Sequence, residues 1–441
     1  MNEFPTSTVG KDVEGIVPMI LSPHGVAGAV GADNPFLSGF GDGVWLDAFG
    51  RLRTSSPTTL FSSTQRYDSD PLRVENYTVG TATATYNQAA SSTLLSTAAA
   101  TAGNRALRQT KTYWIYQPGK SQTVFITGTL RKGAAPTGGS FAGIGYYDDD
   151  NGVYFRDDAN GLSVVRRSSV SGSVVETIIP QAQWDDPMDG TGLSGLILDP
   201  TKEQIFAIDL QWLGVGRVRF GLDIDGVLVD IHSLMHANMT TSVYMQTATL
   251  PVRYEVNNVT TGSTTQVEAL CLVVQSEGGT INSPGLSFEC DDSGTPKTAA
   301  NSAALTPIIS IRCQDTWNGL KFRGHITRFT LNLLALLNPV YWEWTWNATL
   351  TGASFSPVNT SSGAEFDTSA TAYTGGIPIT SGYTASSGQG SNVLGMTATG
   401  APESLILSRT YANTRDVLTL AARGLGGAAT VYCALNYEER R

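Results

Sequence analysis

Two Asn-Gly pairs separate runs of β-branched and aromatic residues, and this pattern constrains the fold more than any other. They lie at 151–152 and 160–161, inside the stretch FAGIGYYDDDNGVYFRDDANGLSVVRRSS at 141–169. Asn-Gly favours a tight hairpin turn because both central residues of that turn need a positive φ. The stretch therefore predicts consecutive antiparallel strands.

The stretch WLGVGRVRFGLDIDG, residues 212–226, has a second interpretation, because glycine-rich loops also bind phosphates. A dinucleotide-binding loop has the pattern GxGxxG after a strand and at the start of a helix, with an acidic residue ~20 positions later. Here the third glycine, Gly221, does not fit that spacing, and β-branched alternation leads into Asp225 and Gly226. We interpret the stretch as another hairpin.

The composition agrees with many short strands joined by turns. Of the 441 residues, 47 are glycine and 41% are hydrophobic, while 15% are charged, below the roughly 25% of typical soluble proteins. We expect an all-β fold with an antiparallel β-sandwich core, for which a resemblance described below implies a jelly-roll or concanavalin-like type. The low charge also suits a protein whose surface is covered by neighbouring subunits.

The chain is expected to divide into three segments. These are an extended N-terminal arm (1–63), a large β-sandwich domain (64–337) and a smaller C-terminal β domain (338–441). The arm is rich in glycine and proline without a lasting period, yet it keeps the apolar residues Ile20, Leu21, Phe36, Leu37, Phe40, Trp45 and Leu46. A disordered tail would keep fewer. We expect the arm to bury them on another subunit by adding a strand to it.

Charge and hydropathy exclude several partners. The net charge is −10 and no Lys/Arg run exceeds a pair, so a nucleic-acid partner is not expected. No stretch reaches the ~20 apolar residues of a membrane span, so no membrane insertion is expected. The first residues lack the basic start and apolar stretch of a signal peptide, which suggests synthesis in a host cytoplasm.

The four cysteines, Cys271, Cys290, Cys313 and Cys433, are widely separated and form no CxxC motif. Buried thiols are the favoured interpretation, and whether any of them pair is left open.

Metal sites have weak candidates only. His232 and His236 have the spacing of a zinc-binding helix, but they lack the glutamate of HExxH and follow a strand. Carboxylates gather at two turns, where an irregular calcium site would draw on Asp148, Asp150, Asp185, Asp186 and Asp189. Neither turn fits the twelve-residue calcium loop. Because aspartate favours turns in any case, no metal and no cofactor is expected.

Catalytic constellations are equally weak. The stretch TGLSGL, residues 191–196, has Leu196 where the last glycine of GxSxG belongs. Glu365 and Asp367 share one strand face, and two carboxylates are the minimum for a glycosidase, but no further acid follows in line. We expect a protein that is not an enzyme.

The stretch YWEWTWNATL, residues 341–350, places Trp342, Trp344 and Trp346 on one strand face. These indoles would either stack on sugar rings or face the core or a subunit boundary. The face continues into Ala348 and Leu350, which favours the second interpretation.

Several stretches resemble virion structural proteins of tailed bacteriophages. They are DAFGRLRTSSPTTLF (47–61), YQPGKSQTVFITG (116–128), GYYDDDNGVYFRDDANGLSVVRRSS (145–169), QWLGVGRVRFG (211–221) and CLVVQSEGG (271–279). The pattern at 145–169 also resembles jelly-roll sandwiches of the lectin and laminin-G type.

The resemblance implies a component of the virion, in the tail, the baseplate, a fibre attachment or, alternatively, a capsid decoration. Its partners would be other copies of itself, in a trimer or ring, and other virion proteins. A carbohydrate-binding host-adsorption protein that binds a host surface glycan and a sandwich-fold glycosidase are the competing functions.

Overall fold

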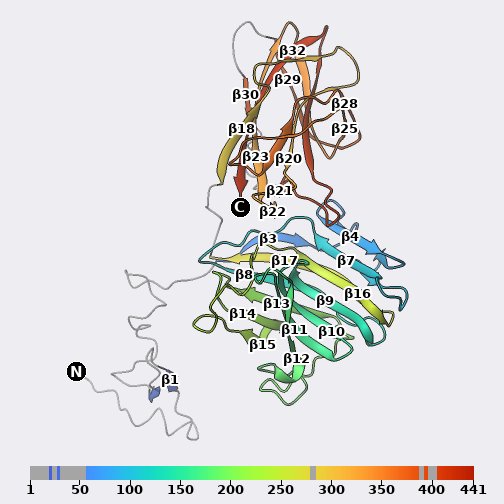
Figure 1. Ribbon diagram of the computed structural model, residues 1–441, viewed down its shortest axis with the longest axis vertical. Coiled ribbons are helices and arrows are strands. Elements are labelled where there is room, and N and C mark those ends of the chain that lie inside the picture. Colours follow the sequence, from blue (N-terminus) through green and yellow to red (C-terminus); the bar gives the residue numbers. More distant parts are fainter. Residues whose placement is uncertain (1–18, 22–26, 30–55, 279–284, 387–391, 396–404) are drawn as a thin grey trace, which may run out of the picture. The chain divides into compact units, whose positions relative to one another are not determined.

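The computed structural model describes residues 19–21, 27–29, 56–278, 285–386, 392–395 and 405–441 (Figure 1). The chain forms two compact units, residues 1–56 and 57–441. In the first unit the strands β1 (Met19–Leu21) and β2 (Ala27–Ala29) pair in antiparallel fashion. The second unit is all-β and contains two sandwiches, each with its own hydrophobic core.

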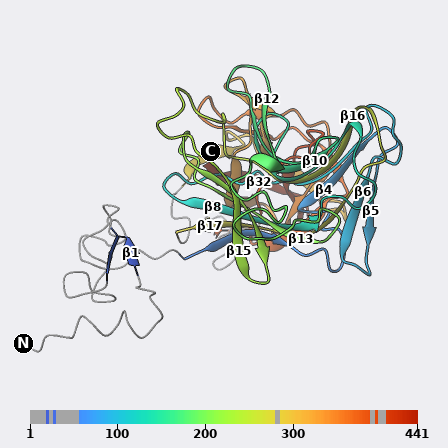
Figure 2. The same cartoon turned by 90° about the horizontal axis from the view of Figure 1, so that it is seen from below.

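The larger sandwich consists of two antiparallel sheets, which Figure 2 shows as two layers. The seven-stranded sheet has the order β12 (Val175–Pro180), β11 (Gly161–Ser168), β10 (Gly152–Asp158), β9 (Gly138–Tyr147), β16 (Val252–Gly262), β7 (Arg105–Thr110) and β4 (Val74–Val79). The eight-stranded sheet has the order β15 (Val227–Leu234), β14 (Val218–Ile224), β13 (Gln204–Leu210), β8 (Ser121–Thr129), β17 (Gln266–Glu277), β6 (Ser92–Ser96) and β5 (Thr83–Asn87), and β3 (Thr58–Ser63) also pairs with β17. A 3-10 turn, η1 (Gln181–Gln183), follows β12.

The smaller sandwich is built in the same way. Its five-stranded sheet has the order β18 (Leu286–Asp291), β32 (Ala429–Arg440), β23 (His325–Leu336) and β30 (Asn392–Gly395), with β19 (Lys297–Ala299) also on β32. Its six-stranded sheet has the order β26 (Ser356–Pro357), β27 (Ala364–Asp367), β20 (Thr306–Cys313), β31 (Val417–Gly424), β24 (Val340–Trp346) and β29 (Ile377–Thr384). Two short pairs complete it, β21 (Thr316–Trp317) with β22 (Leu320–Lys321) and β25 (Thr349–Thr351) with β28 (Ala372–Thr374).

The predicted hairpins are confirmed. Strands β9, β10 and β11 pair in sequence around the two Asn-Gly positions, and β14 pairs with β15 across Asp225 and Gly226. In that last turn both residues have positive φ, 53° and 85°, as a two-residue hairpin turn requires. At the Asn-Gly pairs only the glycines, Gly152 and Gly161, have positive φ, so the turn type there differs from the expected one.

The predicted C-terminal limit of the arm, residue 63, is wrong. Residues Thr58–Ser63 form β3 and pair with β17, and Phe61 lies in the core with 7% of its surface exposed. Of the predicted arm residues, Ile20 and Leu21 lie in β1, where Ile20 pairs with Gly28. The others, Phe36, Leu37, Phe40, Trp45 and Leu46, lie outside the described residues.

The predicted boundary between 337 and 338 is also wrong. Strands β18, β20 and β23 precede it, yet they pair with β32, β31 and β32, so the second sandwich already begins at Leu286. Because a strand acquires its sheet from partners far along the chain, its own sequence does not reveal to which sandwich it belongs.

All four cysteines are free thiols, and Cys290, Cys313 and Cys433 are buried while Cys271 is half-buried. Burial raises the pKa of the Cys313 thiol to about 12. Cys290, Cys313 and Cys433 are therefore buried core thiols, as the sequence suggested, whereas Cys271 is only partly buried.

Candidate functional site

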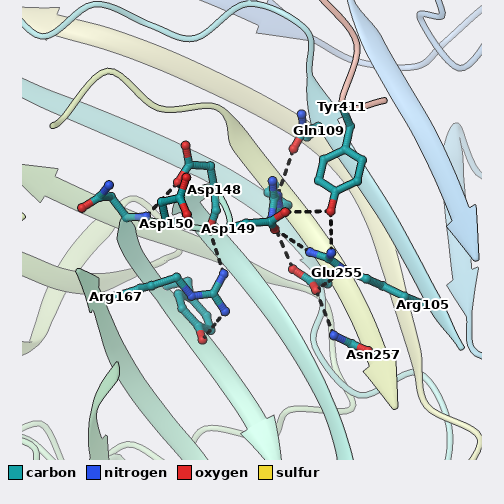
Figure 3. A network of polar contacts seen from close by, with 12 residues as sticks. Arg105, Gln109, Asp148, Asp149, Asp150, Arg167, Glu255, Asn257 and Tyr411 are labelled. Carbon is teal, nitrogen blue, oxygen red and sulfur yellow. Dashed lines mark hydrogen bonds and ion pairs between the residues drawn. The ribbon is translucent and has the colours of Figure 1, made fainter. Parts of the chain in front are cut away.

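The outer face of the seven-stranded sheet carries a dense polar network (Figure 3). Along β16, Val252, Tyr254 and Val256 point into the core, so the alternate residues Arg253 and Glu255 point to the opposite face. Both are nevertheless buried, with 0% and 1% of their surface exposed. Charged groups buried this deeply need partners, and neighbouring strands supply them.

Two arginines and two carboxylates form the centre of the network. Arg105 Nε on β7 donates to Glu255 Oε1 at 2.7 Å, and its Nη2 donates to Asp149 Oδ1 at 2.7 Å. Arg253 Nη1 donates to the same Asp149 oxygen at 2.7 Å. Burial alone would raise the pKa of Glu255, but Arg105 and Arg253 bring this pKa below its ordinary value. The same two arginines outweigh burial and hold the pKa of Asp149 well below its usual range.

Tyr411, from the smaller sandwich, closes the network. Its Oη donates to Asp149 Oδ2 at 2.7 Å and accepts from Arg105 Nη1 at 2.7 Å. Its backbone N–H donates to Glu75 Oε1 at 2.6 Å, and its ring lies 4.6 Å from that of Tyr77 on β4. One residue therefore joins the two sandwiches through a charge-assisted cluster.

An aromatic pair lies beside the network on the same face. The rings of Tyr147 and Tyr154 stack at 4.2 Å with an interplanar angle of 20°, and the Arg167 guanidinium lies 5.3 Å from the Tyr147 ring centroid. Gly143 and Gly145 make room for these rings, because a Cβ at Gly145 would lie 2.4 Å from Tyr154 Cβ. Both tyrosine side chains are therefore buried between the sheet and the arginine side chains.

Arginines hold the two central carboxylates of this network in their ionised form. Glu255 and Asp149 both have lowered pKa values and are held by arginines, so they stay ionised at neutral pH. Within the described parts of the chain, no group of three or more His, Cys, Asp or Glu side chains is placed to hold a metal ion.

The weak calcium candidates cap turns. Asp148 Oδ1 accepts from the backbone N–H groups of Asp150 and Asn151 at 2.9 and 2.7 Å. In the second turn, Asp186 accepts from the backbone N–H groups of Met188 and Ser194, and Asp189 accepts from that of Thr191. Asp185 instead accepts from the backbone N–H of Ser233 on β15. Asp148, Asp186 and Asp189 therefore stabilise backbone turns.

The histidines and acids considered for zinc or hydrolysis are engaged separately. His236 Nδ1 lies 2.8 Å from the carbonyl oxygen of Gly216, whereas His232 Nδ1 lies 3.4 Å from Asp185. Glu365 Oε1 accepts from Arg312 Nε at 2.6 Å and from Arg415 Nη1 at 2.8 Å. Asp367 Oδ2 accepts from the backbone N–H of Ala370 at 3.0 Å.

The tryptophan row faces the core of the smaller sandwich. Trp342 and Trp344 are buried there, and Trp346 packs against the same cluster. Trp342 and Trp344 therefore lie in the core, which is one of the two positions that the favoured interpretation allowed, and neither is exposed to a sugar or to a neighbouring subunit.

Sequence reasoning missed the network itself. Alternation of Arg253 and Glu255 with apolar residues signals a strand with one polar face. Nothing in the local sequence shows that Tyr411, far along the chain, covers that face.

Comparisons with known proteins leave the family open. No protein-family model matches the chain, and no curated protein does. Solved structures give likenesses at low scores. A protein of unknown function from Shewanella oneidensis MR-1 is 10% identical, with 51% of this chain and 88% of that chain covered and a TM-score of 0.33.

Two further structures give similar values. The endo-1,3-β-glucanase of Streptomyces sioyaensis is 10% identical, covering 52% of this chain and 99% of that chain, with a TM-score of 0.32. Arcelin-5, a lectin-like defence protein of Phaseolus vulgaris, is 10% identical, covering 52% and 100%, with a TM-score of 0.27. Scores this low carry no argument about function.

In the described ranges no helix is long and apolar enough to cross a membrane.

The network predicts acid sensitivity. Glu255, Asp149 and Glu176, a β12 residue that forms an ion pair with Arg167, have folded-state pKa values below their ordinary ones. The stability they contribute is complete above the unfolded pKa of about 4 and is lost as pH falls through the folded pKa. Burial raises the pKa of Asp148 and of Glu75, which partly offsets this loss.

We expect the free energy of unfolding, measured in urea, to fall between about pH 5 and pH 2. The slope should be shallower in Glu255→Gln than in the unaltered protein. A free energy that stays constant or rises over this range would contradict the assignment.

Proposed function

We propose that this chain is a non-enzymatic structural component of a bacteriophage particle, a tail, baseplate or fibre-attachment subunit. It joins neighbouring copies by strand and arm exchange. The observation that carries the proposal is an exposed apolar side on the larger sandwich, between the edge strands β12 and β15.

Both edge strands lie on the same side of that sandwich. Phe155 on β10 contacts Phe206 on β13 and Phe220 on β14, at 4.8 and 5.3 Å between ring centroids, so the β12 edge lies opposite the β15 edge. Figure 1 shows the two strands at one end of the sandwich. The segment after β12 reaches across to β15, where Asp186 N–H donates to the carbonyl oxygen of Ile231 at 2.9 Å.

Apolar side chains are concentrated on this side. Among the residues that the structure describes, more than half of the exposed large hydrophobic ones fall between Val170 and Val243. On the two edges and the crossing segment they are Val175, Ile178, Leu193, Ile197, Val227 and Leu228. Leu193 is 100% exposed and Ile197 is 74% exposed. Large exposed apolar patches are typical of protein–protein contact sites, and we infer that these side chains contribute to one.

The edge strands would also orient the contact between neighbouring copies, through backbone hydrogen bonds. A sheet edge offers unpaired backbone N–H and C=O groups to an incoming strand. On β15, the segment at 185–186 already occupies the Ile231–Ser233 part, since Ser233 N–H donates to Asp185 Oδ2 at 2.9 Å. The exposed part that remains, at Val227 and Leu228, suits a short strand such as one from the arm of a neighbouring copy.

The charged groups also favour assembly over hydrolysis. Glu365, the acid most suited to a sandwich glycosidase by sequence, is held between Arg312 and Arg415. The central carboxylates of the larger sandwich are held in the same way.

The test is the native mass of the purified full chain, measured by light scattering after size exclusion. We expect an oligomer, and we expect Leu193→Asp combined with Ile197→Asp to shift the mass towards the 46.8 kDa monomer. Burying two carboxylates in the contact is strongly unfavourable. The matched control is Val259→Asp, at a residue that is 63% exposed and lies away from β12 and β15 in sequence, which should leave the mass unchanged. An identical mass for all three proteins would refute the contact.

A further inference from the structure

The outer face of β24 and β29 carries a group of tyrosines that the sequence did not single out. The tryptophans of β24 point into the core, so Tyr341 and Glu343 point outward. Tyr341 pairs with Tyr383 on β29, and the two ring centroids lie 5.3 Å apart. Tyr383 is 71% exposed, although tyrosine is a large and mostly apolar side chain.

Two charged side chains lie next to these rings. Arg423, from β31 on the other side of β24, pairs with Tyr341 and places its guanidinium 5.4 Å from the Tyr341 ring centroid. Glu343 Oε2 accepts from Tyr341 Oη at 3.0 Å, and its Oε1 accepts from Thr345 Oγ1 at 3.1 Å. The carboxylate is therefore fixed in position. We call Tyr341, Glu343, Tyr383 and Arg423 the tyrosine patch.

The carboxylate of Glu343 retains the capacity to bind a ligand. An ionised carboxylate has about four lone-pair sites, and the two hydroxyl groups occupy one on each oxygen. Glu343 is only half-buried, so its remaining sites can accept from hydroxyl groups outside the protein. Because β29 is the edge strand of its sheet and Tyr383 is 71% exposed, a ligand can reach the Tyr383 ring from solvent.

We propose that the tyrosine patch binds a neutral carbohydrate. The apolar C–H face of a pyranose ring stacks on Tyr383, and two adjacent sugar hydroxyl groups donate to Glu343 and accept from Arg423. This function goes beyond the proposed role in assembly and uses the other sandwich.

The combination of groups favours a sugar over an apolar peptide. A purely apolar partner would desolvate Glu343 and Arg423 without replacing their hydrogen bonds, which is costly. A sugar offers one apolar face and a rim of hydroxyl groups, so it can cover the ring of Tyr383 and satisfy both charges. The Tyr341 ring lies beside the stacking position, and its orientation is fixed by the Arg423 guanidinium and by its hydrogen bond to Glu343.

The experiment uses the full chain on an array of bacterial surface polysaccharides, followed by calorimetry with the retained glycan. We expect Tyr383→Ala to weaken binding about tenfold, since it removes the stacking ring. Glu343→Gln should weaken it about fivefold through loss of the charge-assisted bonds. Tyr383→Phe, which keeps the ring, should retain binding.

The matched control is Tyr67→Ala, at a tyrosine that is 85% exposed in the larger sandwich, and it should bind like the unaltered chain. Thermal unfolding of each variant reports whether it is folded. The proposal is overturned if the unaltered chain retains no glycan, if Tyr383→Ala and Tyr67→Ala bind equally, or if the patch captures an apolar peptide in place of a sugar. Failure of the assembly proposal would leave this binding intact, because Leu193 and Ile197 lie in the other sandwich.

Discussion

Glu255→Ala lowers the free energy of unfolding by about 3–5 kcal/mol, the loss typical of removing one partner from a buried ion pair. Glu255 is 1% exposed and forms ion pairs with Arg105 and Arg253. Without it, the fully buried Arg253 keeps Asp149 as its ion-pair partner, and a buried guanidinium with too little compensating charge is strongly unfavourable. Urea unfolding at neutral pH measures the change.

Two variants control for this result. Glu255→Gln keeps the shape and the acceptor oxygen but removes the charge, so its loss should lie between those of Glu255→Ala and the unaltered protein. Glu203→Ala removes an acid whose ion pair with Lys132 is exposed on both sides, at 44% and 43%, and should change the free energy by less than about 1 kcal/mol. Equal effects of Glu255→Ala and Glu203→Ala would show that the network does not stabilise the fold.

Removal of residues 1–63 destabilises the body of the protein, whereas removal of residues 1–56 leaves it folded. The longer truncation removes seven more residues, of which those from 58 to 63 form β3, which pairs with β17 from Leu272 to Ser276. They also include Phe61, whose ring lies 5.1 Å from that of Trp114 in the core. Loss of a buried phenylalanine side chain alone costs about 3–5 kcal/mol.

The measurement is the urea midpoint of the chains 57–441 and 64–441. The shorter chain should unfold at a clearly lower urea concentration, because it lacks both the β3 ladder and the Phe61 ring. Coincident midpoints would mean that β3 belongs to the arm after all.

The parts of the fold that are determined locally could be predicted from the sequence. The turn at Asp225 and Gly226 has the two positive φ angles that its residue types favour, and period-two alternation identified β14 before it. Alternation likewise placed Trp342 and Trp344 on one face, and the continuation of that face into Ala348 favoured a position in the core or at a subunit boundary. Both side chains lie in the core.

The parts of the fold that depend on partners far along the chain could not be predicted from the sequence. Strand β23 precedes the expected domain boundary, but its partner β32 comes near the end of the given sequence. No feature of residues 325–336 predicts that pairing. The polar network has the same origin, since Arg253 and Glu255 become buried only where Tyr411 and strand β7 cover them. The tyrosine patch could not be predicted either, because it combines side chains of three strands, β24, β29 and β31. It lies on the face of β24 opposite to that of the buried tryptophans.

The central claim, that this chain is a particle subunit joined to its neighbours through its N-terminal segment, is tested by the composition of assembled particles. The measurement is the amount of the chain 57–441 in phage particles produced in cells that supply no full-length copy. The account predicts that this chain is folded and present in the cell but missing from the particles. Its incorporation at the level of the full-length chain would contradict the account.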